Sequence, residues 1–162
     1  MITSWIIALF MLNKPVLKAY EINCGYNDKK IKINFTLEGE FTPLEANETF
    51  KGVCGALKAF RECKYLRTKY PHSKRIGTNI VLSNKLWITK DPNLDTDNCG
   101  YTRRNGEGHI YLTPYFTDSV KCDTPTQVIF HELLHNSSMP DHDLINGSAN
   151  DPIYKTVYAC VK

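Results

Sequence analysis

Two histidines flank a glutamate in the run His131-Glu132-Leu133-Leu134-His135. Residues four apart on a helix lie one turn above each other on the same face, so His131 and His135 can present both imidazoles to one ion. Glu132 is rotated by about 100° from His131 and can reach a bound water without becoming a ligand. The pattern predicts one Zn²⁺ ion held by the two histidines, with Glu132 as the general base.

This arrangement of groups suits hydrolysis of a peptide bond. Zinc accepts nitrogen ligands, and a catalytic zinc keeps one position open for water, whose pKa it lowers towards neutrality. Glu132 would take a proton from the zinc-bound water, and the resulting hydroxide would attack a peptide carbonyl. Glu132 would then pass the proton to the leaving amine.

A zinc site of this kind needs a third protein ligand, and the segment after the histidines offers three candidates. They are Asp141, His142 and Asp143. Pro140 is expected to end the helix, which would let the chain turn back beneath the ion. Spacing alone does not choose among the three.

The helix that carries the motif has a clear start. Thr124 can cap it, Pro125 suits the first helical position, and Gln127 completes a capping box. We therefore expect a helix from Pro125 through His135.

The remaining elements follow from hydrophobic periodicity. Residues 30–35 alternate as in a strand, residues 43–70 read as one helix or two, and residues 76–89 have strand composition. Residues 91–105 are rich in turn formers. Residues 109–113 read as a strand stopped by a proline, so His109 is interpreted as a strand residue and not as a ligand.

The composition fits one domain with its own core, because 42% of the 162 residues are hydrophobic. Lys and Arg number 20 against 17 Asp and Glu, and no basic run or aromatic-basic stripe stands out. A nucleic-acid partner is therefore not expected, and neither is a membrane. We expect a monomer that acts on a protein or peptide substrate.

The N-terminal segment resembles a signal peptide. Residues 5–12 are apolar but too few to cross a bilayer, which needs ~20 residues. With Leu17 and Ala19 at the −3 and −1 positions, residues 1–19 would be the signal peptide and residues 20–162 the mature zinc-peptidase-like domain. A buried N-terminal helix is the alternative.

Six cysteines, all after the expected cleavage point, predict a secreted, disulfide-bonded protein with 15 possible connectivities. Cys54 and Cys63 would lie ~13 Å apart on a straight helix, too far for a disulfide, which needs less than ~7 Å. Four Asn-x-Ser/Thr sequons are present, at Asn34, Asn47, Asn136 and Asn146. We expect the one at Asn136, beside the proposed site, to be unmodified.

The second half of the chain resembles the aspzincin metallopeptidases, which include deuterolysin and the fungal lysine-specific metalloendopeptidases. In that family an Asp in a Gly-Thr-x-Asp-x-x-Tyr-Gly motif follows the His-Glu-x-x-His helix. The likeness covers roughly residues 97–162 and rests on the metal helix with Gln127 before it and on four other runs: Cys99-Gly100-Tyr101-Thr102, Ile110 to Phe116 with the following Cys122, Asp143-Leu144-Ile145-Asn146-Gly147, and Asn150 to Cys160.

The resemblance implies a single-domain α+β zincin-like fold, helix-rich with a small sheet and disulfides. It implies that His131, His135 and Asp143 bind zinc and that Glu132 is the base. It also implies that Cys99 pairs with Cys122.

Two positions depart from the family motif. Gly-Thr is absent before the Asp, and the tyrosine that supports the oxyanion is replaced by Asn146, whose side chain can also donate a hydrogen bond but is shorter. Tyr154 or His142 is a possible replacement donor. The departure leaves open whether catalysis is weakened, altered or lost.

A second likeness concerns Met139-Pro140-Asp141-His142, which is similar to the segment after the zinc helix in snapalysin-type peptidases. There the Asp ten residues after the first histidine binds zinc, and Asp141 has that spacing. The ranking is therefore Asp143 first, Asp141 second and His142 third.

Three functions compete on this evidence. The first is an extracellular zinc endopeptidase, the second a catalytically impaired zinc-binding effector or interaction protein on the same fold, and the third a disulfide-rich interaction domain without metal. By likeness to the lysine-specific relatives, Asp151, Glu107 or Asp118 could line a subsite for a basic side chain. Surface solvation explains these acids equally well.

Overall fold

The computed structural model describes residues 16–26, 29–93, 98–102, 107–140, 142 and 151–162. Over these residues the chain is a mixed α+β structure with a five-stranded sheet, five helices and three disulfides. None of the described helices is long and apolar enough to cross a membrane.

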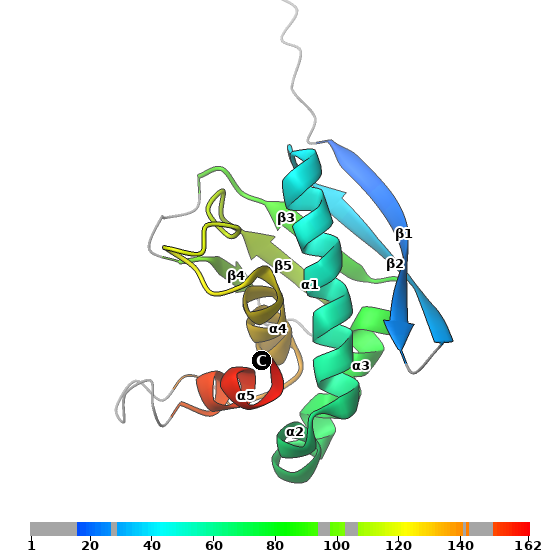
Figure 1. The fold of residues 1–162 in the computed structure, drawn as a ribbon, viewed down its shortest axis with the longest axis vertical. Coiled ribbons are helices and arrows are strands. Elements are labelled where there is room, and N and C mark those ends of the chain that lie inside the picture. The colour runs from blue at the N-terminus through cyan, green and yellow to red at the C-terminus, as the bar shows by residue number, and fades with distance from the viewer. Residues whose placement is uncertain (1–15, 27–28, 94–97, 103–106, 141, 143–150) are drawn as a thin grey trace, which may run out of the picture.

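The sheet has the strand order β1-β2-β3-β5-β4 (Figure 1). β2, β3 and β5 run parallel to one another, and β1 and β4 are antiparallel to their neighbours β2 and β5. The strands are β1 Leu17–Tyr26, β2 Lys29–Glu38, β3 Leu86–Lys90, β4 Gly100–Thr102 and β5 His109–Leu112.

Helices cover one face of this sheet, as the burial of alternate strand residues shows. The side chains directed into the core from the three parallel strands are Ile33, Phe35, Leu37, Leu86, Ile88, Ile110 and Leu112, each at most 2% exposed. The helices are α1 Pro43–Glu62, α2 Lys64–Lys69, α3 Pro71–Leu82, α4 Pro125–Asn136 and α5 Pro152–Cys160 (Figure 1).

Most of the predicted elements are present, but two segments differ from the prediction. β4, Gly100–Thr102, lies within residues 91–105, which were expected to be rich in turns. The strand near residues 30–35 is β2, and the 43–70 segment forms two helices, α1 and α2. Residues 76–82, predicted as strand, are the second half of α3. Pro71 starts this helix, and Gly77 packs so closely on Phe60 that a Cβ would overlap the ring. Helical packing against α1 therefore overrides the β-branched composition.

The expected cleavage point is close to the start of the first strand. β1 begins at Leu17, and Ala19 pairs with Thr36 of β2. The apolar run at residues 5–12 lies outside the described residues, so the signal peptide stays a prediction.

The three disulfides are Cys24–Cys54, Cys63–Cys160 and Cys99–Cys122. Cys54 and Cys63 have separate partners, as helix geometry requires, and the Cys99–Cys122 pairing implied by the family resemblance is confirmed. Three disulfides in one small domain indicate an extracellular or otherwise oxidising environment.

Glycine lets α4, the helix of the histidine motif, pack closely against α1. A Cβ at Gly52 would lie 2.5 Å from Ile129 Cδ1 and 3.1 Å from the carbonyl oxygen of Pro125. Further along the same interface, the rings of Phe60 and Phe130 meet at 4.8 Å between centroids. The position of α4 therefore depends on a small residue at 52.

We expect Gly52→Val to destabilise the fold by about 1–3 kcal/mol, because the new side chain must push α4 away from α1. Gly25→Val is the matched control, since a Cβ at Gly25 meets nothing within 4 Å. Urea unfolding of both variants measures the difference. Equal stability of the two variants would contradict close α1–α4 packing.

Candidate metal centre

The helix α4 begins as the sequence predicts. The Gln127 backbone N–H donates to Thr124 Oγ1 at 3.3 Å, and the Thr124 N–H donates to Gln127 Oε1 at 3.1 Å, which together form a capping box. The apolar side chains that hold the helix in the core are Val128, Ile129, Phe130, Leu133 and Leu134, all at most 5% exposed.

His131 and His135 lie on the same side of α4, one turn apart. Their Nε2 atoms are 3.3 Å from each other, and their ring centroids are 5.1 Å apart. The predicted convergence of these two imidazoles is therefore present.

The end of α4 differs from the prediction. The helix stops at Asn136, four residues before Pro140, and Ser138 takes a left-handed conformation with φ of 61°. The helix thus ends in a turn around Ser138, before Pro140 is reached. The Asn136 amide donates to Thr102 Oγ1 at 2.5 Å and joins the end of the helix to β4. Because Asn136 is only 2% exposed, its position agrees with an unmodified sequon.

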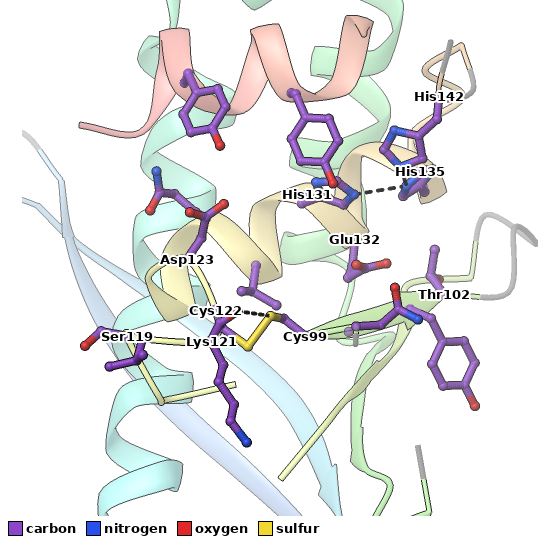
Figure 2. Close-up of a pocket in the computed structure, with 18 residues that line it drawn as sticks. Cys99, Thr102, Ser119, Lys121, Cys122, Asp123, His131, Glu132, His135 and His142 are labelled. Atoms are coloured by element: carbon purple, nitrogen blue, oxygen red, sulfur yellow. Dashed lines mark hydrogen bonds between the residues drawn. A yellow bond between two sulfur atoms is a disulfide. The ribbon is translucent and has the colours of Figure 1, made fainter. Parts of the chain in front are cut away.

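After this turn, His142 reaches the other two histidines. Its Nε2 atom lies 3.0 Å from His135 Nε2, and its ring centroid lies 5.1 Å from that of His131. One nitrogen from each ring falls within 4.8 Å of the others. Figure 2 shows the three rings gathered together, with Glu132 beside them. In the described part of the chain, these three histidines are the group able to hold a metal ion.

The donor set fits a divalent transition metal. Tetrahedral ligands about 2.1 Å from zinc lie about 3.4 Å apart, close to the 3.0 and 3.3 Å between these Nε2 atoms. Three neutral imidazoles that meet through their Nε2 atoms cannot all hydrogen-bond to one another, because each Nε2 is either an N–H donor or a lone-pair acceptor. A shared cation resolves this conflict by accepting a lone pair from every ring.

The local electrostatics favour the neutral form of His131. Burial, together with the neighbouring His135 and His142, lowers its pKa to about 3 against the opposing effect of Asp151. A neutral imidazole is the form that ligates metals, so this ring needs no deprotonation at physiological pH.

Asp151 fixes the orientation of His142. Its Oδ2 atom lies 2.6 Å from His142 Nδ1, and its Oδ1 atom accepts the backbone N–H groups of Ile153 and Tyr154 at 2.8 and 3.0 Å. Burial alone would raise the pKa of Asp151, but the Tyr154 N–H and His142 outweigh burial and lower it. An ionised carboxylate only accepts, so His142 carries its proton on Nδ1 and directs the lone pair of Nε2 towards the other histidines.

The Glu132 side chain lies next to the edge strand β4. It is 5% exposed, and burial raises its pKa to about 8. A Cβ at Gly100 would lie 3.3 Å from Glu132 Cγ and 2.9 Å from the Tyr111 carbonyl oxygen. Gly100 therefore lets β4 pass close to the carboxylate. Apart from its place in the Cys99-Gly100-Tyr101-Thr102 run, no sequence pattern predicts this role of Gly100.

Tyr154, one of the three candidate oxyanion donors, lies beside the histidines. Its ring centroid is 5.1 Å from that of His131 and 5.3 Å from that of His142. Burial, followed by the charge of Asp151, raises its pKa, so the phenol keeps its proton. Of the other two candidates, His142 belongs to the histidine cluster, and Asn146 lies outside the described residues.

Asp143 and Asp141, the two higher-ranked candidates for third ligand, also lie outside the described residues. The third-ranked candidate, His142, is the candidate that lies within the described residues, and it is at the site. His109 lies in β5, as expected, and its Nε2 atom is 2.8 Å from Thr89 Oγ1, away from the histidine cluster.

A pocket of about 830 Å³ opens beside the three histidines and Glu132. The Cys99–Cys122 disulfide, Asp123 and Tyr158 also line it. Sequence reasoning missed Asp123 and Tyr158, which carry no motif. Of the three acids considered for a basic subsite, none belongs to the described lining of this pocket, and Asp151 is engaged with His142.

No family model, no curated protein and no solved structure matches this chain. The aspzincin and snapalysin resemblances therefore stay predictions from short motifs.

Proposed function

We propose that this protein is a secreted zinc-dependent endopeptidase whose metal is held by His131, His135 and His142. The observation that carries the proposal is the convergence of three imidazole nitrogens next to the buried carboxylate of Glu132. A purely structural site needs no such carboxylate in its neighbourhood. The zincin-like fold is part of the same proposal.

When bound, the ion would supply a Lewis acid that polarises a carbonyl and favours ionisation of water. Its charge would also favour the ionised form of Glu132, opposing the effect of burial. Glu132 then accepts a proton from the attacking water and returns it to the leaving amine. The Tyr154 hydroxyl is the proposed donor to the oxyanion that develops on the substrate.

A peptide is the substrate class that the pocket favours. β4 is the last strand of the sheet among the described residues, and Gly100, Tyr101 and Thr102 of this strand line the pocket. An extended peptide can add to such an edge through main-chain hydrogen bonds, which places its carbonyl groups alongside Glu132.

The second candidate is a zinc-binding effector or interaction protein without catalysis. The replacement of the motif tyrosine by Asn146 favours it, because the family's oxyanion donor is then missing. Incubation of the zinc-loaded, oxidised protein with a broad peptide library separates the two candidates. Cleavage that a chelator abolishes and zinc restores supports the enzyme; zinc binding without any cleavage supports the second candidate.

A further inference from the structure

Positive charge is concentrated in one part of the chain. Between Glu62 and Asp91 there is no acidic residue, whereas Lys and Arg occur seven times. The rest of the chain holds 13 basic and 17 acidic residues. The net charge of the whole chain is therefore small, but its positive charges are unevenly distributed along the sequence.

Five of these basic residues belong to α2 and the first half of α3, and these two helices meet at the end of the molecule shown at the bottom of Figure 1. We call Lys64, Arg67, Lys69, Lys74 and Arg75 the basic surface. Four of the five are exposed and Lys74 is half-buried. Lys74 and Arg75 are neighbours, and the other members are separated by one to four residues, so the five form no continuous run in the sequence. The two short helices place all five at this end of the molecule.

The basic surface is not neutralised by the protein itself. In the described part of the chain, ion pairs link Lys32 to Glu21, Lys51 to Glu48 and Lys90 to Glu45, and no ion pair of the described residues involves the basic surface. Arg75 instead approaches His72, with Nη2 lying 3.4 Å from Nδ1.

Helix stabilisation does not account for these positions. Cations stabilise the last turn of a helix and destabilise the first. Arg67 and Lys69 do lie in the last turn of α2. Lys64, however, is the first residue of α2, and Lys74 lies close to the start of α3, whose first turn contains no acid.

We propose that the basic surface binds an acidic polysaccharide carrying sulfate or carboxylate groups. The three disulfides indicate an oxidising environment, where such polysaccharides are available as polyanions. Lys and Arg neutralise a regularly charged polymer and release its counterions, which makes binding strong at low salt.

Two other polyanions fit the surface less well. Proteins that bind a membrane surface usually insert exposed apolar side chains next to the charged ones. In the described part of the chain, the exposed large apolar residues lie outside α2 and the first half of α3. Single-stranded nucleic acid stacks on free aromatic faces. Tyr65 and Tyr70 are half-buried and pack on each other at 6.3 Å between ring centroids.

None of the five residues lines the pocket beside the histidines. The basic surface is therefore a second site, and the proposal does not depend on the zinc site or on catalysis.

Heparin serves as the probe in a binding experiment with the oxidised, full chain. Arg67→Gln/Arg75→Gln removes two charges from the basic surface, and Lys30→Gln/Lys85→Gln removes two exposed charges elsewhere. We expect the first pair to weaken heparin binding roughly tenfold at 0.15 M salt and to reduce the slope of log affinity against log salt by about two. The second pair should change affinity less than twofold.

The proposal is overturned if the unmodified protein does not bind heparin at this salt, or if both variants lose affinity equally. Tighter binding to phosphatidylserine vesicles or to single-stranded RNA than to heparin would also overturn it. Zinc content, measured on every variant, should stay unchanged. A loss confined to heparin binding is thereby distinguished from a failure of the metal site.

Discussion

Replacing Glu132 by glutamine is expected to slow peptide hydrolysis by about 100- to 10,000-fold, the usual contribution of a general base. The amide has nearly the same shape as the carboxylate but cannot accept a proton from water. The proposed zinc ligands are the three histidines and not Glu132, so the variant should keep its zinc. Initial rates on a cleaved library peptide, together with zinc content by mass spectrometry, test both statements.

Glu62→Gln is the matched control for this measurement, since Glu62 is exposed at the end of α1 and outside the pocket lining. It should cleave at the unmodified rate. An active Glu132→Gln variant would show that the proton leaves by another route. Loss of zinc from that variant would show that Glu132 is a ligand.

Replacing Asp151 by asparagine is expected to weaken zinc binding about 10- to 100-fold. With its oxygen still capping α5, the new amide would direct an N–H group at His142 Nδ1 and force the ring proton onto Nε2. In that tautomer Nε2 has no lone pair for the metal, and the lone pair of Nδ1 faces the amide. The dissociation constant, measured by competition with a coloured chelator, reports the loss.

Asp151→Ser separates the metal role of Asp151 from its role as a helix cap. Serine is as good an N-cap as aspartate, but it is too short to reach His142 in the same way. We expect the metal-free serine variant to unfold with nearly the unmodified stability and yet to bind zinc more weakly. If it binds zinc with the original affinity, Asp151 acts only as a cap.

The sequence was most informative where one short segment determines both structure and chemistry. The capping box at Thr124 and the four-residue spacing of His131 and His135 are local properties, and α4 follows both. The rejection of a Cys54–Cys63 disulfide needed only the rise per residue of a helix.

Interactions between distant segments were harder to predict. The β-branched residues of the second half of α3 suggested a strand, but contact with α1 through Gly77 and Phe60 makes the segment helical. The position of His142 depends on Asp151, nine residues later, and on a left-handed Ser138. Neither feature has a spacing rule, so residues 141–143 could not be distinguished by sequence alone.

The concentration of basic residues on α2 and α3 also depends on how two segments are placed in the fold. Spaced basic residues do not form a run, and only the two short helices place Lys64 and Arg75 on one end of the molecule.

Zinc titration of the His142→Ala variant tests the central claim most directly. The comparison is with the unmodified protein and with Asp141→Asn/Asp143→Asn, all followed by chelator competition at neutral pH. We expect one tightly bound zinc ion per chain in the unmodified protein and in the double variant, and a loss of at least about 100-fold in affinity for His142→Ala. Unchanged affinity in His142→Ala, with loss in the double variant, would contradict the three-histidine centre and return the third position to a carboxylate.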